Sequence, residues 1–111
     1  MRQQIKLIKI SKAPKSSRFK YFAFFNKNGK EIKRGFGANS YSDYTIHKDK
    51  NRRNRYIKRH LKDLKTNDPT RAGYLSMYVL WNYPSLTKSI SDYKRRLNIY
   101  NRTGKFPKKI Q

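Results

Sequence analysis

The sequence has 111 residues, and its 29 Lys and Arg against six Asp and Glu give a net charge of +23. So dense a charge destabilises a compact fold through self-repulsion unless an anionic partner relieves it. The length allows one domain with a modest core and argues against a separate catalytic lobe. The lack of cysteine excludes disulfides and thiolate metal sites, and no apolar run approaches the roughly 20 residues of a membrane span.

Residues 1–18 form a basic segment that we interpret as an N-terminal arm or an edge strand. The apolar alternation that begins at Ile5 changes phase at Ile8, so a strand here needs a β-bulge, and Pro14 ends it. An edge strand completed by a partner is one form that this segment can take. Its basic residues are Arg2, Lys6, Lys9, Lys12, Lys15 and Arg18.

The clearest local structure is a β-hairpin, because Asn28-Gly29 supplies the two positive-φ positions of a type I′ turn. The resulting register pairs Phe25 with Ile32 and Tyr21 with Phe36 on one face, and it places Phe22 and Phe24 on the other. Both faces carry large apolar groups. We therefore expect helices to cover one face and a further strand or a partner to cover the other.

A helix is predicted from about Thr45 to Lys65 because five residues project within a narrow arc at about 100° per residue: Ile46, Ile57, His60, Leu61 and Leu64. Five cations project from the opposite side within about 80° of arc and about 21 Å of axis. We name these cations the basic stripe: Lys48, Arg52, Arg55, Arg59 and Lys62. Only two acidic residues offset nine basic ones between residues 48 and 65, whereas solvated helix faces usually mix both signs. The stripe therefore predicts a polyanion-binding surface, with a merely solvated face as the alternative.

Two further helices are predicted after this one. Asp68-Pro69 is typical of a cap followed by the first helical position, and the apolar stretch from there to Trp81 is predicted to form the centre of the core. Ser85 can cap the last helix, whose buried face is formed by Leu86, Ile90, Tyr93 and Leu97.

These elements together predict an α+β fold in which an N-terminal hairpin, with an optional added edge strand, packs against about three helices. The single small domain spans residues 19–98. A basic C-terminal tail of residues 99–111 follows it, with further cations at Arg102, Lys105, Lys108 and Lys109.

Acid–base chemistry or metal binding has one candidate cluster, which consists of Asp43, His47, Asp49 and His60. Such residues can hold Mg²⁺ beside a base in a nuclease, but helix capping and ion pairing also account for them. The spacing is not diagnostic, so we expect no enzyme activity, no metal and no cofactor.

Aromatic residues beside cations offer a second candidate surface. Phe22 and Phe24 next to Lys20 and Lys33 could stack the bases of a single strand. We favour core packing instead, because so small a domain needs most of its aromatic residues inside.

Several short strings give the chain a family resemblance over roughly residues 21–97. They are Phe36-Gly37-Ala38, Ser42-Asp43-Tyr44-Thr45, His47-Lys48-Asp49, Arg59-His60, Ala72-Gly73 and Leu80-Trp81-Asn82. In this order they resemble a family of short basic proteins of unknown function that are encoded by large DNA viruses of algae and protists. The resemblance implies a viral setting and a component of the particle, without implying chemistry.

The leading functional hypothesis is a non-enzymatic minor capsid protein of a large DNA virus particle, whose stripe and basic ends bridge anionic neighbours. Its partners would be larger capsid or other virion proteins, or viral DNA, with no membrane span and no small-molecule substrate. It would reside in the virion and, during assembly, in the host cytoplasm. The alternative is sequence-nonspecific DNA or RNA binding, and the third hypothesis is a small Mg²⁺-dependent nuclease.

Overall fold

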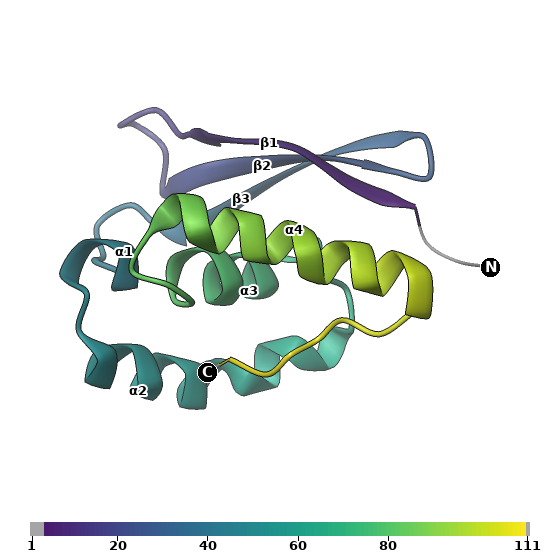
Figure 1. The fold of residues 1–111 in the computed structure, drawn as a ribbon. Coiled ribbons are helices and arrows are strands. Elements are labelled where there is room, and N and C mark those ends of the chain that lie inside the picture. The colour runs from purple at the N-terminus through teal and green to yellow at the C-terminus, as the bar shows by residue number, and fades with distance from the viewer. Residues whose placement is uncertain (1–3, 111) are drawn as a thin grey trace.

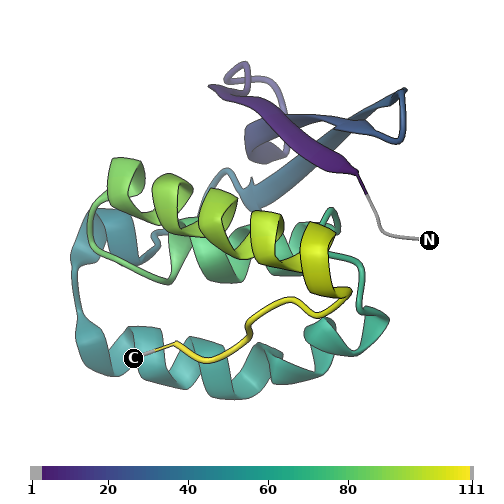
Figure 2. The same cartoon turned by 45° about the vertical axis from the view of Figure 1, so that its right-hand side comes forward.

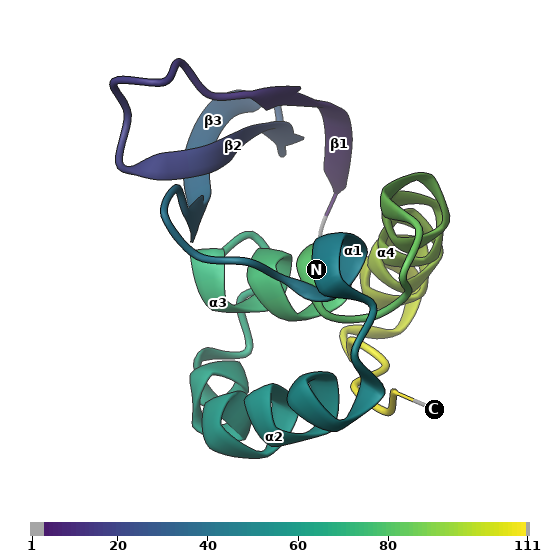
Figure 3. The same cartoon turned by 90° about the vertical axis from the view of Figure 1, so that its left-hand side faces the viewer.

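A three-stranded antiparallel sheet of order β1-β2-β3 forms one outer layer of the molecule (Figure 1). The computed structural model describes residues 4–110. Within these residues every helix lies on the same face of the sheet, as the turned views also show (Figures 2 and 3). α3 and α4 lie next to the sheet, and α2 lies farthest from it. The predicted α+β class is confirmed, with a sheet of three strands rather than a hairpin alone.

The hairpin joins β2 (Phe19–Lys27) to β3 (Lys30–Ala38). Asn28 and Gly29 have φ values of 53° and 87°, as a tight turn of this kind requires. Phe25 pairs with Ile32 and Tyr21 with Phe36, so the predicted register is confirmed. Phe25 and Phe36 are fully buried against the helices.

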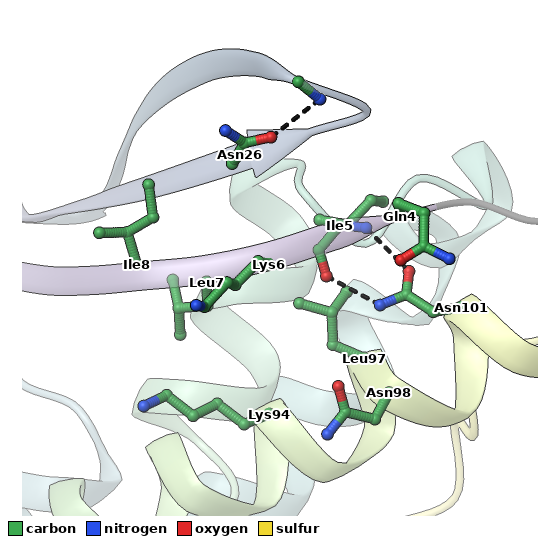
Figure 4. Close-up of a pocket in the computed structure, with 11 residues that line it drawn as sticks. Gln4, Ile5, Lys6, Leu7, Ile8, Asn26, Lys94, Leu97, Asn98 and Asn101 are labelled. Atoms are coloured by element: carbon green, nitrogen blue, oxygen red, sulfur yellow. Dashed lines mark hydrogen bonds between the residues drawn. The ribbon is translucent and has the colours of Figure 1, made fainter.

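β1 (Ile5–Lys12) is one of the two edge strands and pairs with β2 of the same chain. The register shifts between Leu7 and Lys9, which confirms the expected bulge. The side chain of Asn101 on α4 holds the start of this strand: its Oδ1 accepts from the Ile5 amide at 3.0 Å, and its Nδ2 donates to the Ile5 carbonyl at 2.8 Å (Figure 4). Asn101 thus makes the bonds that another strand would otherwise make at this edge.

The helix predicted from residue 45 to residue 65 is three elements: α1 (Tyr44–His47), α2 (Lys50–His60) and the 3₁₀ helix η1 (Leu61–Thr66). The prediction of one continuous helix was wrong because Lys48 adopts a left-handed conformation, with φ at 56°, and Asp49 caps a new helix. A projection at 100° per residue does not continue across this break or into 3₁₀ geometry. Ile46 and Leu61, which were expected on the buried side, are therefore 61% and 53% exposed.

The centre of the core is the segment formed by α3 (Ala72–Leu75) and the π-helical turn η2 (Ser76–Leu80). Its large side chains are at most 1% exposed from Tyr74 to Leu80 apart from Ser76, which confirms its predicted central position. The helix begins three residues later than expected. The Asp68 carboxylate accepts from the amide and the hydroxyl of Thr70 and so forms a turn there instead of a helix cap.

α4 (Leu86–Thr103) begins at Ser85, whose hydroxyl accepts from the Lys88 amide as predicted. The helix runs past the expected boundary at residue 98, and the segment after Gly104 folds back between α4 and α2 (Figure 1). Phe106 in this segment is only 7% exposed, and the Tyr78 hydroxyl donates to the Lys108 carbonyl at 2.7 Å. The C-terminal residues are therefore packed against the domain rather than extended from it.

Gly37 ends the regular part of β3 with φ at +75°, and a Cβ atom there would lie 2.8 Å from Cδ1 of Leu80. We expect Gly37→Ala to lower the free energy of unfolding by about 2 kcal/mol, from the left-handed backbone and the contact together. Gly104→Ala is the matched control, because Gly104 has φ at +78° with open space around it. Urea denaturation should show a smaller loss for the control, and equal losses would contradict a role for the Leu80 contact.

Candidate functional site

A pocket of about 440 Å³ lies where the end of β3 meets α2 and the end of η2. We name it the β3–α2 pocket. Its lining residues are Lys20, Gly37, Ala38, Tyr41, Ser42, Asp43, Arg52, Tyr56, Arg59, His60, Ser76, Leu80 and Trp81. Eight of these thirteen belong to the strings on which the viral resemblance rests. Segments from four separate parts of the sequence thus meet at one place.

A buried ion pair fixes one wall of the pocket. Asp43 is 1% exposed, caps α1 by accepting from the Thr45 amide, and lies 2.6 Å from Nζ of Lys20 on β2. The Thr45 hydroxyl donates to the same carboxylate. The pair links β2 to the start of α1. Because Asp43 neutralises Lys20, this ammonium group adds no net charge to the pocket.

The second wall is a stack of aromatic rings. Tyr56 on α2 lies parallel to Trp81, with ring centroids 4.2 Å apart and planes inclined by 4°. Tyr56 also stacks on His60, with the two ring centroids 4.1 Å apart. Burial raises the pKa of Tyr56 to about 12 from an ordinary value of 10.0 that already keeps its hydroxyl protonated near pH 7.

Arg52 and Arg59 supply the free positive charge of the pocket. Both are exposed, and they lie seven residues apart on α2, close to the same side of the helix. Within residues 4–110 no ion pair neutralises either guanidinium. The pocket therefore presents two Arg side chains and an aromatic stack to an incoming anion.

The rest of the basic stripe lies outside this pocket. Arg55 is exposed on α2, Lys62 is exposed on η1, and Lys48 is exposed in the break between α1 and α2. The stripe is thus distributed over α2, η1 and the break before α2, with Arg52, Arg55 and Arg59 forming its regular part.

The other basic residues named from the sequence are exposed wherever the structure describes them. β1 carries Lys6, Lys9 and Lys12, and the loop that follows carries Lys15 and Arg18. α4 carries Arg102 near its end, and the C-terminal segment carries Lys105, Lys108 and Lys109. Arg2 lies outside the described residues.

The residues considered for nuclease chemistry have structural partners. Asp49 accepts from the amides of Asn51 and Arg52, and His60 Nδ1 lies 3.0 Å from Asp63. His47 Nδ1 accepts from the Asp49 amide, and burial together with the nearby Arg52 lowers the pKa of His47. In the part of the chain that the structure describes, no three acidic or histidine side chains gather as a metal ion would require.

Sequence reasoning missed Tyr56 and the pocket-forming role of Trp81. The four-residue spacing of Tyr56 and His60 on one helix was a usable signal, since such pairs face each other. Trp81 was expected in the core, and it is instead half-buried at the pocket wall.

Comparisons with known proteins place a similarity on the first half of the chain. The model of a family described as being of unknown function (DUF5754) matches residues 8–60, slightly less than half of the sequence. This segment runs from β1 to the end of α2 and contains ten of the thirteen pocket residues. No curated protein and no solved structure matches the chain. None of the helices in residues 4–110 has the length and hydrophobicity needed to cross a membrane.

Proposed function

We propose that this protein is a non-enzymatic, sequence-nonspecific nucleic-acid-binding protein that grips the phosphate backbone with α2. The observation that carries the proposal is the β3–α2 pocket, where two exposed Arg side chains that form no ion pair within residues 4–110 stand beside an aromatic stack. A guanidinium binds phosphate through two parallel hydrogen bonds, and an aromatic surface can contact a base or sugar. A nucleic acid offers both groups at every nucleotide.

The spacing along α2 suits a backbone contact. Arg52 and Arg59 are separated by about 10 Å of helix axis, and Arg55 lies between them on the same side. Successive phosphates of one DNA strand are about 3.4 Å apart along the duplex axis, so a similar distance covers about three phosphate-to-phosphate steps. With Lys48 and Lys62 at the two flanks, we expect about five phosphates to be neutralised.

The folding of both terminal segments onto the domain favours nucleic acid over bridging between capsid subunits. β1 is a strand of the sheet, and the C-terminal segment lies against the helices, so neither of these described segments is free to thread along neighbours. The minor capsid role and the virion location stay predictions that rest on the resemblance. Cross-linking mass spectrometry on particles, before and after nuclease treatment, separates the two roles: nuclease-resistant links to a shell subunit would support the capsid role.

A catalytic role receives no support from the carboxylates that were considered for it. Asp43 is paired with Lys20, and Asp49 is used at the N-terminus of α2. A site for Mg²⁺ would have to remove at least one of them from these bonds.

Titration of duplex affinity against salt tests the proposal. We expect the logarithm of the association constant for a labelled duplex of about 20 base pairs to fall with the logarithm of salt concentration, with a slope near −4.5 for about five phosphates. Two duplexes of unrelated sequence should give the same slope and similar affinities in fluorescence anisotropy. A slope near zero, or no binding at about 50 mM salt, would contradict the proposal.

A further inference from the structure

The face of the sheet that points away from the helices carries half-buried aromatic rings. The pleat places Phe22 and Phe24 on this outer face, opposite to the buried Ala23 and Phe25. Figures 1 and 3 show every helix on the other side. The third strand, β1, extends the sheet sideways instead of covering it. In residues 4–110 no further strand covers this face, which leaves a partner as the other cover expected from the sequence.

Cations lie over these rings. Lys33 Nζ is 4.3 Å from the ring centroid of Phe22, Lys9 Nζ is 4.9 Å from that of Phe24, and the Arg18 guanidinium is 4.9 Å from that of Phe19. We name these three rings and three cations the outer-face cluster. None of the six is acidic, and Glu31, paired with Asn26, lies on the same face two residues from Lys33 toward the hairpin turn.

A glycine makes room for the third ring. Gly35 pairs with Phe22, and a Cβ atom at Gly35 would lie 2.4 Å from the ring of Phe19. Phe19 can therefore lie across Gly35 and meet Phe22 edge to face, with centroids 6.1 Å apart. Phe24 is joined to this pair through Lys33, whose Nζ lies 5.8 Å from the Phe24 centroid as well as over Phe22.

We propose that the outer-face cluster stacks the unpaired bases of a single-stranded nucleic acid. Phe22 and Phe24 are two residues apart on one strand, or about 6.6 Å, so each can take a separate base. A base that stacks on Phe22 or Phe24 would displace the ammonium group over that ring, and the displaced Lys9 or Lys33 would stay within reach of the phosphate. An apolar protein partner would instead have to bury these ammonium groups without counter-charges, which is costly. The inference deepens the proposed function by naming a second surface, on the opposite side of the molecule from α2 (Figure 1).

Three ligands of equal length test this inference: a mixed-sequence 20-nucleotide strand, the same backbone without bases, and the corresponding duplex. We expect the wild-type protein to bind the complete strand at least tenfold more tightly than the abasic strand. Phe22→Ala together with Phe24→Ala should remove this preference, since each stacked base is worth on the order of tenfold in affinity, while abasic binding stays unchanged. Tyr83→Ala is the matched control, because Tyr83 is an exposed ring beside Lys88 at another place on the surface.

A second variant reports on the stacking without removing a ring. Phe24→Trp should retain the affinity for the complete strand, and its added fluorescence should be quenched by that strand and not by the abasic one. Equal binding of complete and abasic strands, or absence of quenching, would overturn the stacking surface while leaving phosphate binding by α2 intact. Failure of all three ligands to bind would overturn the proposed function as well.

Discussion

Reversing the charge of Arg52, Arg55 and Arg59 to Glu is expected to weaken duplex binding about 500-fold at 0.1 M salt. Each lost phosphate contact removes about 0.9 from the salt slope, so the slope should fall from near −4.5 to near −1.8. All three side chains are exposed on α2, and none of them forms an ion pair within residues 4–110, so the fold should tolerate the change. Anisotropy titrations at several salt concentrations measure both quantities.

A control variant with the same net charge distinguishes direct contact by α2 from the general attraction between a basic protein and DNA. Lys30, Lys88 and Lys94 are exposed on the hairpin and on α4, and their reversal to Glu lowers the net charge by the same six units from +23. We expect this control to lose only the weaker, long-range part of the attraction and to keep its slope. A stripe variant that binds the duplex like the control would eliminate α2 as the contact surface.

The hairpin and the last helix were predictable because their signals are local. Asn28-Gly29 specifies its own turn, and Ser85 specifies its own cap, whatever the rest of the chain does. The apolar period from Leu86 onward then identified Tyr93 as buried, and it is. The break at Lys48 had a weaker signal, because Lys rarely adopts positive φ and only Asp49 marked the start of a new helix.

The β3–α2 pocket was not predictable, because it depends on contacts between distant segments. Lys20 meets Asp43 across 23 residues, and Tyr56 meets Trp81 across 25. Neither pair has a spacing rule that the sequence reveals. The stripe was found from helical periodicity, but periodicity does not reveal that Arg52 and Arg59 share a pocket with aromatic rings.

The second large effect is expected at Asp92, which holds together the C-terminal half of the fold. Its carboxylate accepts from Arg96 Nε at 2.6 Å, from Arg95 at 2.8 Å and from Asn82 at 2.7 Å. Arg96 is itself buried, and it donates to the carbonyls of Pro107 and Lys109 in the C-terminal segment. This one guanidinium therefore links α4 to the chain that follows it.

We expect Asp92→Ala to lower the free energy of unfolding by about 3–5 kcal/mol, because it leaves the buried guanidinium of Arg96 without its counter-charge. Arg95→Ala is the matched control: it removes an exposed partner of the same carboxylate and should cost less than about 1 kcal/mol. Urea denaturation measures both variants. Similar losses in the two would show that the burial of Arg96 does not matter.

The same network gives a signed pH dependence. Burial opposes ionisation of Asp92, but the hydrogen bonds from Arg96, Arg95 and Asn82 outweigh it and hold the pKa of this carboxyl below its usual 3.8. Since the folded state has the lower pKa, this stabilisation is complete above about pH 4 and is lost as the pH falls through the folded value. Denaturation midpoints of the wild-type protein should therefore drop steeply below pH 4, and Asp92→Ala should make that drop shallower. If the midpoints of the variant fell below pH 4 as steeply as those of the wild type, other carboxylates would control acid unfolding. Asp92 would then stabilise the fold through packing and hydrogen bonds that do not depend on its charge.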